Sequence, residues 1–195
     1  MPLTHFLIRH GQTDWNAELR LQGQHDIPLN DLGRRQATEN GRKLAGIAGD
    51  LAAFAFVSSP LGRTRETMER LREEAGLDPL NYQTDPRLVE ICFGDWEGHT
   101  LDEIGAVTPE KLAERDAAKW DFVPPGALAE SYEILSWRVG SWLKSLDRDT
   151  VCVCHGGVIR CLLKLTGHFT GEEAAKLTVP QDRILRLRDG EAEWL

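Results

Sequence analysis

The sequence predicts an α/β fold, a three-layer α/β/α sandwich whose central sheet is mostly parallel. Two short apolar runs each end in His-Gly: residues 6–8 lead into Arg-His-Gly at 9–11, and residues 150–154 lead into His-Gly-Gly at 155–157. Continuous apolar runs of strand length indicate strands that are buried on both faces, as in parallel sheets. These strands alternate along the chain with segments of helical periodicity, which favours this fold class.

The composition limits the possible function classes. A chain of 195 residues fits one domain with a sizeable core, so we expect a single domain over residues 1–195, with a cap or lid region around 95–130. The net charge of −8 argues against nucleic-acid binding and against anionic membrane surfaces. Any anion site must therefore be a local concentration of arginine.

Neither a signal peptide nor an apolar run of membrane-spanning length is apparent, so we expect a soluble, cytoplasmic protein. Four cysteines, Cys92, Cys152, Cys154 and Cys161, lack the paired spacing of a structural zinc site. We expect reduced thiols, no metal and no cofactor. The sequence does not predict the oligomeric state.

The first predicted strand places Arg9 and His10 at its carboxyl end, where open α/β sheets bind their ligands. A guanidinium beside an imidazole there indicates an anionic substrate and a nucleophile or base. The alternative is a histidine at the edge of the core beside a surface arginine. Residues 14–29 show neither strand nor helix periodicity, and this polar stretch is predicted to be a loop beside the site.

The next segments predict a helix and then a second buried strand that ends at the same edge of the sheet. Asn30 or Asp31 can cap a helix that runs to about Ala48. Its predicted apolar face consists of Ala37, Gly41, Leu44, Ala45 and Ala48. Residues 54–59 predict a second buried strand, and a helix opens near residue 61. Arg63 then lies at a strand-to-helix junction on the same edge as His10, which makes it a second candidate for phosphate contact.

Residues 88–98 mix carboxylates with apolar and aromatic side chains. An apolar environment raises the pKa of a carboxyl group, as a general acid requires, so Glu90, Asp95 and Glu97 are candidates by residue type. At least two of the three are expected to be ordinary surface carboxylates.

Helices and one hairpin account for most of the remaining chain. Short helices are predicted between residues 101 and 119, followed by a Pro-rich break at 124–126. The positions of Val139, Trp142, Leu143 and Leu146 mark a long helix before the strand at 150–154, and residues 158–165 form another helix. Residues 184–187 and 192–195 read as a terminal β-hairpin.

Four blocks, taken together and in order, resemble the histidine phosphatase superfamily, the branch that includes phosphoglycerate mutases and their phosphatase relatives. The blocks are residues 7–16 (LIRHGQTDWN), 58–64 (SSPLGRT), Glu90 with 93–98 (FGDWEG), and 155–160 (HGGVIR). The resemblance covers nearly the whole chain and implies a phosphoglycerate mutase-like sheet with helices on both faces.

The resemblance also implies roles for individual residues. His10 would be the nucleophile that becomes phosphohistidine, Arg9, Arg63 and His155 would hold the phosphoryl oxygens, and Glu90 would protonate the leaving oxygen. Asn16, Gln22 and Gly23 match positions that help to bind phosphate or substrate in relatives. Two arginines and a second imidazole around one histidine suit phosphoryl transfer without a metal.

Within the family, the short chain and the 93–98 block look more like the phosphatases, including the α-ribazole phosphatase type, than the mutases. The expected function is hydrolysis of small phosphorylated metabolites, with phosphoglycerate mutase-type transfer as the alternative. Two segments depart from the family pattern, the cap loop at 125–131 and Gln181-Asp182-Arg183 near the last strand. We expect that neither departure touches the proposed catalytic residues.

Two competing hypotheses remain. Cys154 stands where relatives have Ser or Thr, so residues 154–160 also satisfy the Cys-x5-Arg pattern of cysteine-dependent phosphatases. That mechanism would use a thiolate at a helix N-terminus, but it leaves Arg9, His10 and Arg63 unexplained. The other hypothesis is a catalytically silent phosphate-binding module.

Overall fold

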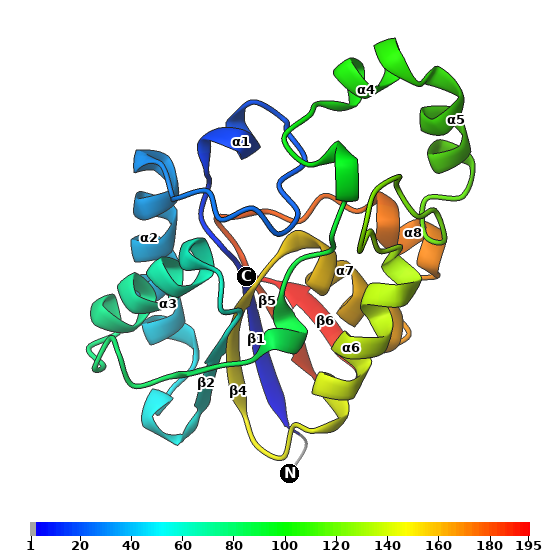
Figure 1. Ribbon diagram of the computed structural model, residues 1–195. Helices are drawn as coiled ribbons and strands as arrows, with labels where there is room; N and C mark the ends of the chain where they lie inside the picture. The colour runs from blue at the N-terminus through cyan, green and yellow to red at the C-terminus, as the bar shows by residue number, and fades with distance from the viewer. Residues whose placement is uncertain (1–2) are drawn as a thin grey trace.

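The computed structural model describes residues 3–195 (Figure 1). Over this range six strands form one sheet in the order β3-β2-β4-β1-β5-β6. They are β1 (Thr4–Arg9), β2 (Ala55–Ser58), β3 (Gln83–Thr84), β4 (Thr150–Cys154), β5 (Ile184–Arg188) and β6 (Glu191–Trp194). Strands β1 to β4 pair in parallel, whereas β5 runs antiparallel to β1 and β6 antiparallel to β5. The predicted α/β class with a mostly parallel sheet is confirmed.

Helices cover both faces of this sheet (Figure 1). They are α1 (Asp14–Ala17), α2 (Asp31–Ile47), α3 (Gly62–Glu74), α4 (Leu101–Val107), α5 (Pro109–Ala117), α6 (Tyr132–Lys144), α7 (Gly156–Leu165) and α8 (Gly171–Lys176). Single 3-10 turns occur at Leu51–Ala53, Pro86–Leu88 and Gly94–Trp96.

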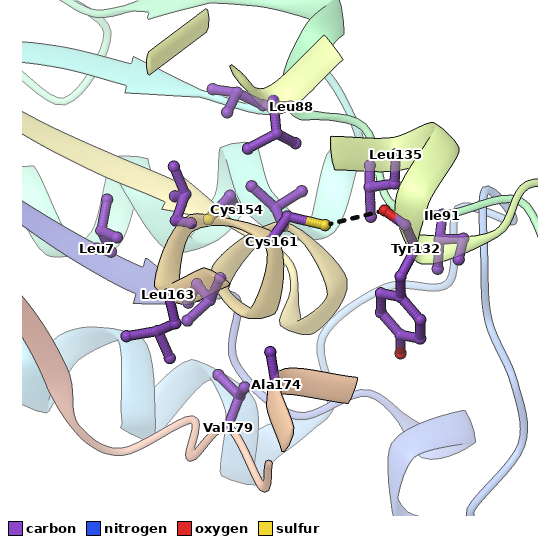
Figure 2. Close-up of a cluster of buried hydrophobic side chains, with 14 of the residues drawn as sticks. Leu7, Leu88, Ile91, Tyr132, Leu135, Cys154, Cys161, Leu163, Ala174 and Val179 are labelled. Carbon is purple, nitrogen blue, oxygen red and sulfur yellow. Dashed lines mark hydrogen bonds between the residues drawn. The ribbon is translucent and has the colours of Figure 1, made fainter. Parts of the chain in front are cut away.

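The two central strands divide their side chains between two cores because successive strand residues point to opposite faces. Leu7 and Cys154 pack toward α6 and α7, in a cluster that includes Leu88, Leu135 and Leu163 (Figure 2). The alternate strand residues pack toward α2 and α3; this second cluster contains Phe6, Ile8, Leu44, Met68, Leu71, Val151 and Val153. Burial on both faces explains why the strands read as continuous apolar runs.

The site edge of the sheet is defined by the pairing of β1 with β4. Their register aligns Arg9 with Cys154, so both strands end at the same level. The His10 amide then donates to the Cys154 carbonyl at 3.0 Å, beyond the last strand pair. The two His-Gly segments, 145 positions apart in the sequence, are brought together by this register.

The predicted helix after residue 30 is confirmed as α2. The Asn30 Oδ1 accepts from the Gly33 amide at 2.9 Å and so caps the first turn, which otherwise has unpaired amides. Ala37, Gly41 and Leu44 are buried as expected, but Ala45 is exposed. The hairpin β5–β6 is also confirmed, and Asp189 and Gly190 take the positive φ values that its two-residue turn requires.

Three short elements were not predicted. Within the loop expected at 14–29, α1 forms a single turn held by a capping box, in which the Thr13 hydroxyl accepts from the Asn16 amide and the Asn16 side chain accepts from the Thr13 amide. Helix α8 and the two-residue strand β3 are likewise too short to show a period. Elements of one or two turns are formed by local caps and tertiary pairing, which periodicity does not reveal.

The segment from Asp95 to Glu130 carries α4 and α5 and lies over the carboxyl ends of β1 and β4 (Figure 1). Pro109 is the first residue of α5, where the amide hydrogen that proline lacks would have no partner within the helix. Among residues 3–195, no helix has both the length and the apolar character needed to cross a bilayer.

Candidate active site

A cavity of about 190 Å³ opens at the carboxyl ends of β1 and β4, beneath the segment that carries α5. Seven of the eight predicted site residues line it: Arg9, His10, Asn16, Gln22, Gly23, Arg63 and Glu90. The eighth, His155, does not line the cavity and lies buried behind His10. The structure therefore brings all the predicted residues to one place, although they come from distant parts of the chain.

The His10 ring is 3% exposed, and its hydrogen bonds define its neutral tautomer. Nδ1 lies 2.8 Å from the Gly11 carbonyl oxygen, which can only accept, so Nδ1 carries the proton. Nε2 is then an unprotonated nitrogen. Burial, followed by the charges of Arg63 and Arg9, holds the pKa of His10 well below its usual range. The ring is therefore neutral and nucleophilic at neutral pH.

Arg63 is 1% exposed and lies in the first turn of α3, where the strand-to-helix junction was predicted. Its Nε donates to His10 Nε2 at 3.3 Å, and its Nη2 donates to the Gly23 carbonyl at 2.8 Å. Its Nη1 donates to the His25 carbonyl. These carbonyls anchor the guanidinium, and the positive φ of Gly23 shapes the loop that presents them.

His155 is fully buried, and its ring packs edge-on against His10 with 5.2 Å between centroids. Its Nε2 shares a 2.8 Å hydrogen bond with the Ser59 hydroxyl. Burial, then the positive charge of Arg63, holds the pKa of His155 well below its usual range. Sequence reasoning did not assign a role to Ser59, although the 58–64 block contains it.

Several buried polar atoms of the site have no hydrogen-bond partner within residues 3–195. They are Arg9 Nε, His155 Nδ1 and both amide atoms of Gln22. The other end of Arg9 is fixed, since its Nη1 donates to the Val179 carbonyl at 2.8 Å. Burial, and then the charge of Arg160, lowers the pKa of Arg9 to about 10. Such unpaired buried groups are costly unless a ligand pairs with them.

Of the three predicted carboxylates, Glu90 is the one that lines the cavity. Its Oε1 accepts from the Ile91 amide at 3.0 Å, and its Oε2 accepts from the Gly157 amide at 3.1 Å, at the N-terminus of α7. The other two candidates lie elsewhere. Asp95 is exposed, and Glu97 is an ion-pair partner of His25 that also accepts from the Phe93 amide.

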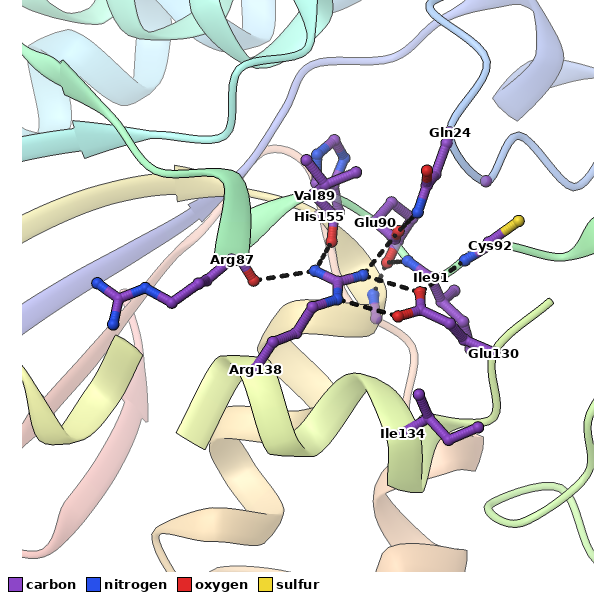
Figure 3. A network of polar contacts seen from close by, with 12 residues as sticks. Gln24, Arg87, Val89, Glu90, Ile91, Cys92, Glu130, Ile134, Arg138 and His155 are labelled. Atoms are coloured by element: carbon purple, nitrogen blue, oxygen red, sulfur yellow. Dashed lines mark hydrogen bonds and ion pairs between the residues drawn. The ribbon is translucent and has the colours of Figure 1, made fainter. Parts of the chain in front are cut away.

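An arginine that sequence reasoning missed supports the backbone around Glu90 (Figure 3). Arg138 of α6 donates to the carbonyls of Arg87, Val89 and Glu90, and forms a two-fold ion pair with Glu130. The Glu130 carboxylate also accepts from the Cys92 amide at 3.0 Å. This network fixes the segment that carries Glu90, although nothing in the local sequence pairs Arg138 with it.

Asn16 is linked to His10 by a residue from the last loop. The Gln181 Nε2 donates to the His10 carbonyl and to Asn16 Oδ1, each at 3.0 Å. The expectation that the departure at 181–183 does not touch the catalytic residues is therefore wrong, because the loop before β5 folds back onto the carboxyl end of β1 and Gln181 contacts His10.

Cys154 belongs to the core and not to the cavity. It is the last residue of β4 and is fully buried in the apolar cluster that packs toward α6 and α7, and the cavity lining does not include it (Figure 2). Its carbonyl, not its thiol, reaches the site through the His10 amide. The arrangement that the Cys-x5-Arg pattern requires, a thiol inside the phosphate loop, is not the one found here.

The cavity is strongly positive in a chain of net charge −8. It is lined by six cationic side chains, Arg9, Arg20, Arg63, Arg115, Lys119 and Arg160, and by two carboxylates, Glu90 and Glu130. Across residues 3–195, no three or more His, Cys, Asp or Glu side chains form a group that could hold a metal ion. The arrangement suits an anionic ligand that contacts a neutral imidazole.

Comparison with known proteins agrees with this geometry. The family model for branch 1 of the histidine phosphatase superfamily matches residues 5–194. Glucosyl-3-phosphoglycerate phosphatase of Mycolicibacterium vanbaalenii is 36% identical over 201 residues, with 97% of this chain and 81% of that protein covered. A probable phosphoglycerate mutase of Escherichia fergusonii is 34% identical over 199 residues, with 97% and 86% covered.

Solved structures give the same result. The mycobacterial glucosyl-3-phosphoglycerate phosphatase has a TM-score of 0.76 at 30% identity, covering 95% of this chain and 90% of that one. An Escherichia coli structure, provisionally assigned as an alpha-ribazole-5'-P phosphatase, has a TM-score of 0.80 and covers 100% and 95%, but at 24% identity it shows the fold alone. The resemblance inferred from four sequence blocks is confirmed, and the chain belongs to branch 1 of the histidine phosphatase superfamily.

Proposed function

We propose that this protein is a metal-independent phosphomonoesterase that acts on small phosphorylated metabolites through a phosphohistidine at His10. The observation that carries the proposal is the tautomer of His10: the Gly11 carbonyl accepts the Nδ1 proton, and Nε2 keeps a lone pair that accepts from Arg63 Nε until a substrate takes the place of that contact. Phosphoryl transfer needs an aligned nucleophile and positive donors around the equatorial oxygens, and the surroundings of His10 contain both.

Arg9, Arg63 and His155 are the proposed phosphoryl ligands. Arg9 Nε and His155 Nδ1 are buried without partners within residues 3–195, so each can pair with a phosphoryl oxygen without losing another bond. Arg63 Nε can exchange its contact with His10 for one with the ligand. Asn16, Gln22 and Gly23 are proposed to complete the phosphate-binding loop, and Gln22 has both amide atoms free for this.

In the first chemical step, the lone pair of His10 Nε2 forms a bond to phosphorus as the ester P–O bond breaks. The proton of the Glu90 carboxyl group passes to the leaving oxygen, which departs as an alcohol. Two guanidinium groups and the second imidazole stabilise the charge on the three equatorial oxygens. In a site of this charge, no metal is needed for that task.

In the second step, a water molecule attacks phosphorus from the side that the alcohol has left. Glu90, now a carboxylate, accepts the proton of the water, and the N–P bond breaks to restore neutral His10 and release inorganic phosphate. The same group thus acts as acid and then as base.

The proposed substrate is a small metabolite because the cavity volume is about 190 Å³. Nucleic acids and membranes are not proposed as partners, since the net charge is −8. The cytoplasm is the proposed location; the four cysteines are free, and three of them are buried, as expected for thiols of a reducing compartment.

Phosphoglycerate mutase-type transfer is the second candidate, and the 34% identity with a probable phosphoglycerate mutase favours it. Both reactions share the first step. They differ in whether water or a substrate hydroxyl then accepts the phosphoryl group.

The experiment that tests the proposal measures phosphate release from a panel of phosphomonoesters in the presence of a chelator. Wild type, His10→Ala and Cys154→Ser are compared, and interconversion of phosphoglycerates is followed in parallel. We expect activity in wild type and Cys154→Ser, none in His10→Ala, and an acid-labile, base-stable phosphoprotein after rapid quenching of the wild type.

The reverse pattern, with activity lost only in Cys154→Ser, would overturn the proposal. Interconversion without phosphate release would assign the mutase reaction. Absence of both reactions in wild type would favour the phosphate-binding module.

A further inference from the structure

The loop between α8 and β5, residues 177–183, contains neither helix nor strand, but side chains hold its backbone in place. Four of its carbonyls accept hydrogen bonds from side chains: those of Leu177, Val179, Gln181 and Asp182 pair with Arg160, Arg9, Asn40 and Lys43 in that order. The donors belong to β1, α2 and α7, so three separate elements fix this loop. One of the donors, Arg9, is also a proposed phosphoryl ligand.

Asn40 is a polar residue that α2 buries completely. Its Nδ2 donates to the Gln181 carbonyl at 3.0 Å, while its Oδ1 has no partner within residues 3–195. A buried amide is costly unless it is hydrogen-bonded, and without this contact the Asn40 amide would be entirely unpaired. The backbone of Gln181 is therefore anchored from α2.

The direction of the Gln181 side-chain amide follows from its partners. Its Nε2 donates to the His10 carbonyl and to Asn16 Oδ1, each at 3.0 Å. A backbone carbonyl can only accept, so the NH2 group of Gln181, and not its amide oxygen, must face His10. The carbonyl of the proposed nucleophile thus fixes Gln181 as a donor toward Asn16.

The direction of the Asn16 side-chain amide is then determined by two contacts. Its Oδ1 accepts from the Thr13 amide at 3.2 Å and from Gln181 Nε2 at 3.0 Å. A backbone amide can only donate, so both contacts require the oxygen on this side. Asn16 lines the cavity, and its Nδ2 has no hydrogen-bond partner within residues 3–195. The group that remains for a ligand is therefore a donor, as an anion requires.

We propose that Gln181 is a positioning residue of the phosphoryl site: it holds the Asn16 amide so that Nδ2 donates to an oxygen of the phosphoryl group at His10. The inference rests on the proposed function, and it adds to the site a residue from the loop that departs from the family pattern. Without Gln181, the Asn16 Oδ1 keeps only its contact with Thr13, and the amide can rotate its oxygen toward the ligand. An oxygen there repels a phosphoryl group, whereas the nitrogen forms a charge-assisted hydrogen bond.

Binding of inorganic phosphate, measured by isothermal titration, tests this role without turnover. Wild type, Gln181→Met, Asn16→Ala and the double variant are compared. Methionine keeps the length of the glutamine side chain but cannot donate. We expect Kd to rise about three- to tenfold in Gln181→Met, which loses a neutral hydrogen bond, and about tenfold or more in Asn16→Ala, which loses a hydrogen bond to a charged ligand.

The double variant separates positioning from packing. If Gln181 acts through Asn16, its replacement has no further effect once the Asn16 amide is absent, so Kd of the double variant should match Asn16→Ala within about twofold. Asp182→Ala is the matched control in the same loop, because the Asp182 side chain is exposed and forms no hydrogen bond or ion pair within residues 3–195. This control should leave Kd unchanged. Losses that multiply in the double variant, or an equal loss in Asp182→Ala, would overturn the proposal.

NMR of side-chain amides gives a second measurement, which needs no variant of Gln181. The Asn16 NH2 signals are identified by their absence from the spectrum of Asn16→Ala. In wild type they should shift when phosphate is added, because Nδ2 gains an acceptor. Unchanged signals at saturating phosphate, or no phosphate binding by wild type, would contradict the role assigned to Gln181.

Failure of this proposal is distinguishable from failure of the proposed function. Phosphate binding with the expected coupling, in a protein that hydrolyses no ester, would retain the role of Gln181 and reject the phosphatase. Ester hydrolysis with losses that multiply in the double variant would retain the phosphatase and reject the role of Gln181.

Discussion

The Nε of Arg63 donates a hydrogen bond to the Nε2 of His10 across 3.3 Å, so the guanidinium marks the nitrogen that bears the lone pair. The opposite side of the ring is held by the Gly11 carbonyl. These two contacts indicate the same tautomer. Gly11 is the next residue in the chain, whereas the fold brings Arg63 of α3 to His10 from a distant part of the sequence.

Arg63→Lys should lower kcat/KM by about 10²-fold or more, in the range found when one donor to a transition-state oxygen is removed. Lysine keeps the charge but cannot contact His10, Gly23 and His25 together, because it lacks the planar fork. Steady-state kinetics with a good substrate measure the loss. Arg65→Lys is the control, since Arg65 is exposed on the same helix; an equal loss in both variants would contradict the role assigned to Arg63.

The two histidines predict a pH dependence. Both are neutral in the folded protein, with pKa values well below the usual 6.5. Their pKa values are lower in the folded than in the unfolded state, so unfolding takes up protons below about pH 6.5. Stability should therefore be full above this pH and fall as the pH decreases toward the folded pKa values.

Histidine NMR titration and urea unfolding at several pH values check this prediction. The His10 resonances should show no protonation at pH 6.5. In the His10→Ala variant, part of the acid-dependent loss of stability should disappear. A His10 pKa near 6.5 would contradict the neutral, buried ring.

Gly157→Ala should impair the step that Glu90 serves. A Cβ at this position would fall on the Glu90 Oε1, closer than any real contact, so the carboxylate must move. We expect a larger loss of kcat for alkyl phosphates than for p-nitrophenyl phosphate, whose leaving group needs little protonation. Gly140→Ala is the control: its Cβ would make ordinary contact with Leu165, and the helix should be stabilised by up to about 1 kcal/mol.

Arg138→Gln should destabilise the protein by about 1–3 kcal/mol, because three backbone carbonyls lose a donor and Glu130 loses its ion-pair partner. Adding Glu130→Gln should recover part of this loss, since it removes the unpaired charge. Urea denaturation measures both variants. Arg148→Gln, which breaks an exposed pair with Asp147, should change stability by less than about 1 kcal/mol.

Much of this molecule was determined by the sequence alone. The apolar runs before His10 and His155 predicted β1 and β4, and Asn30 predicted the start of α2, because buried strands and capped helices have local signatures. The order and spacing of four short blocks predicted the family, and the resemblance identified most of the site residues that were found to line the cavity. These features depend on neighbours in the chain.

Only the tertiary structure decided which groups meet. The parallel register of β1 with β4 placed His155 behind His10, burial turned Cys154 into the core, and helix packing aligned Arg138 with the carbonyls around Glu90. It also brought Lys119 and Arg160 into one cavity and joined Gln181 to His10. The physical reason is that a local sequence pattern shows only which face of a helix or strand a side chain lies on. Which other side chains and charges it meets there depends on how the elements pack in three dimensions.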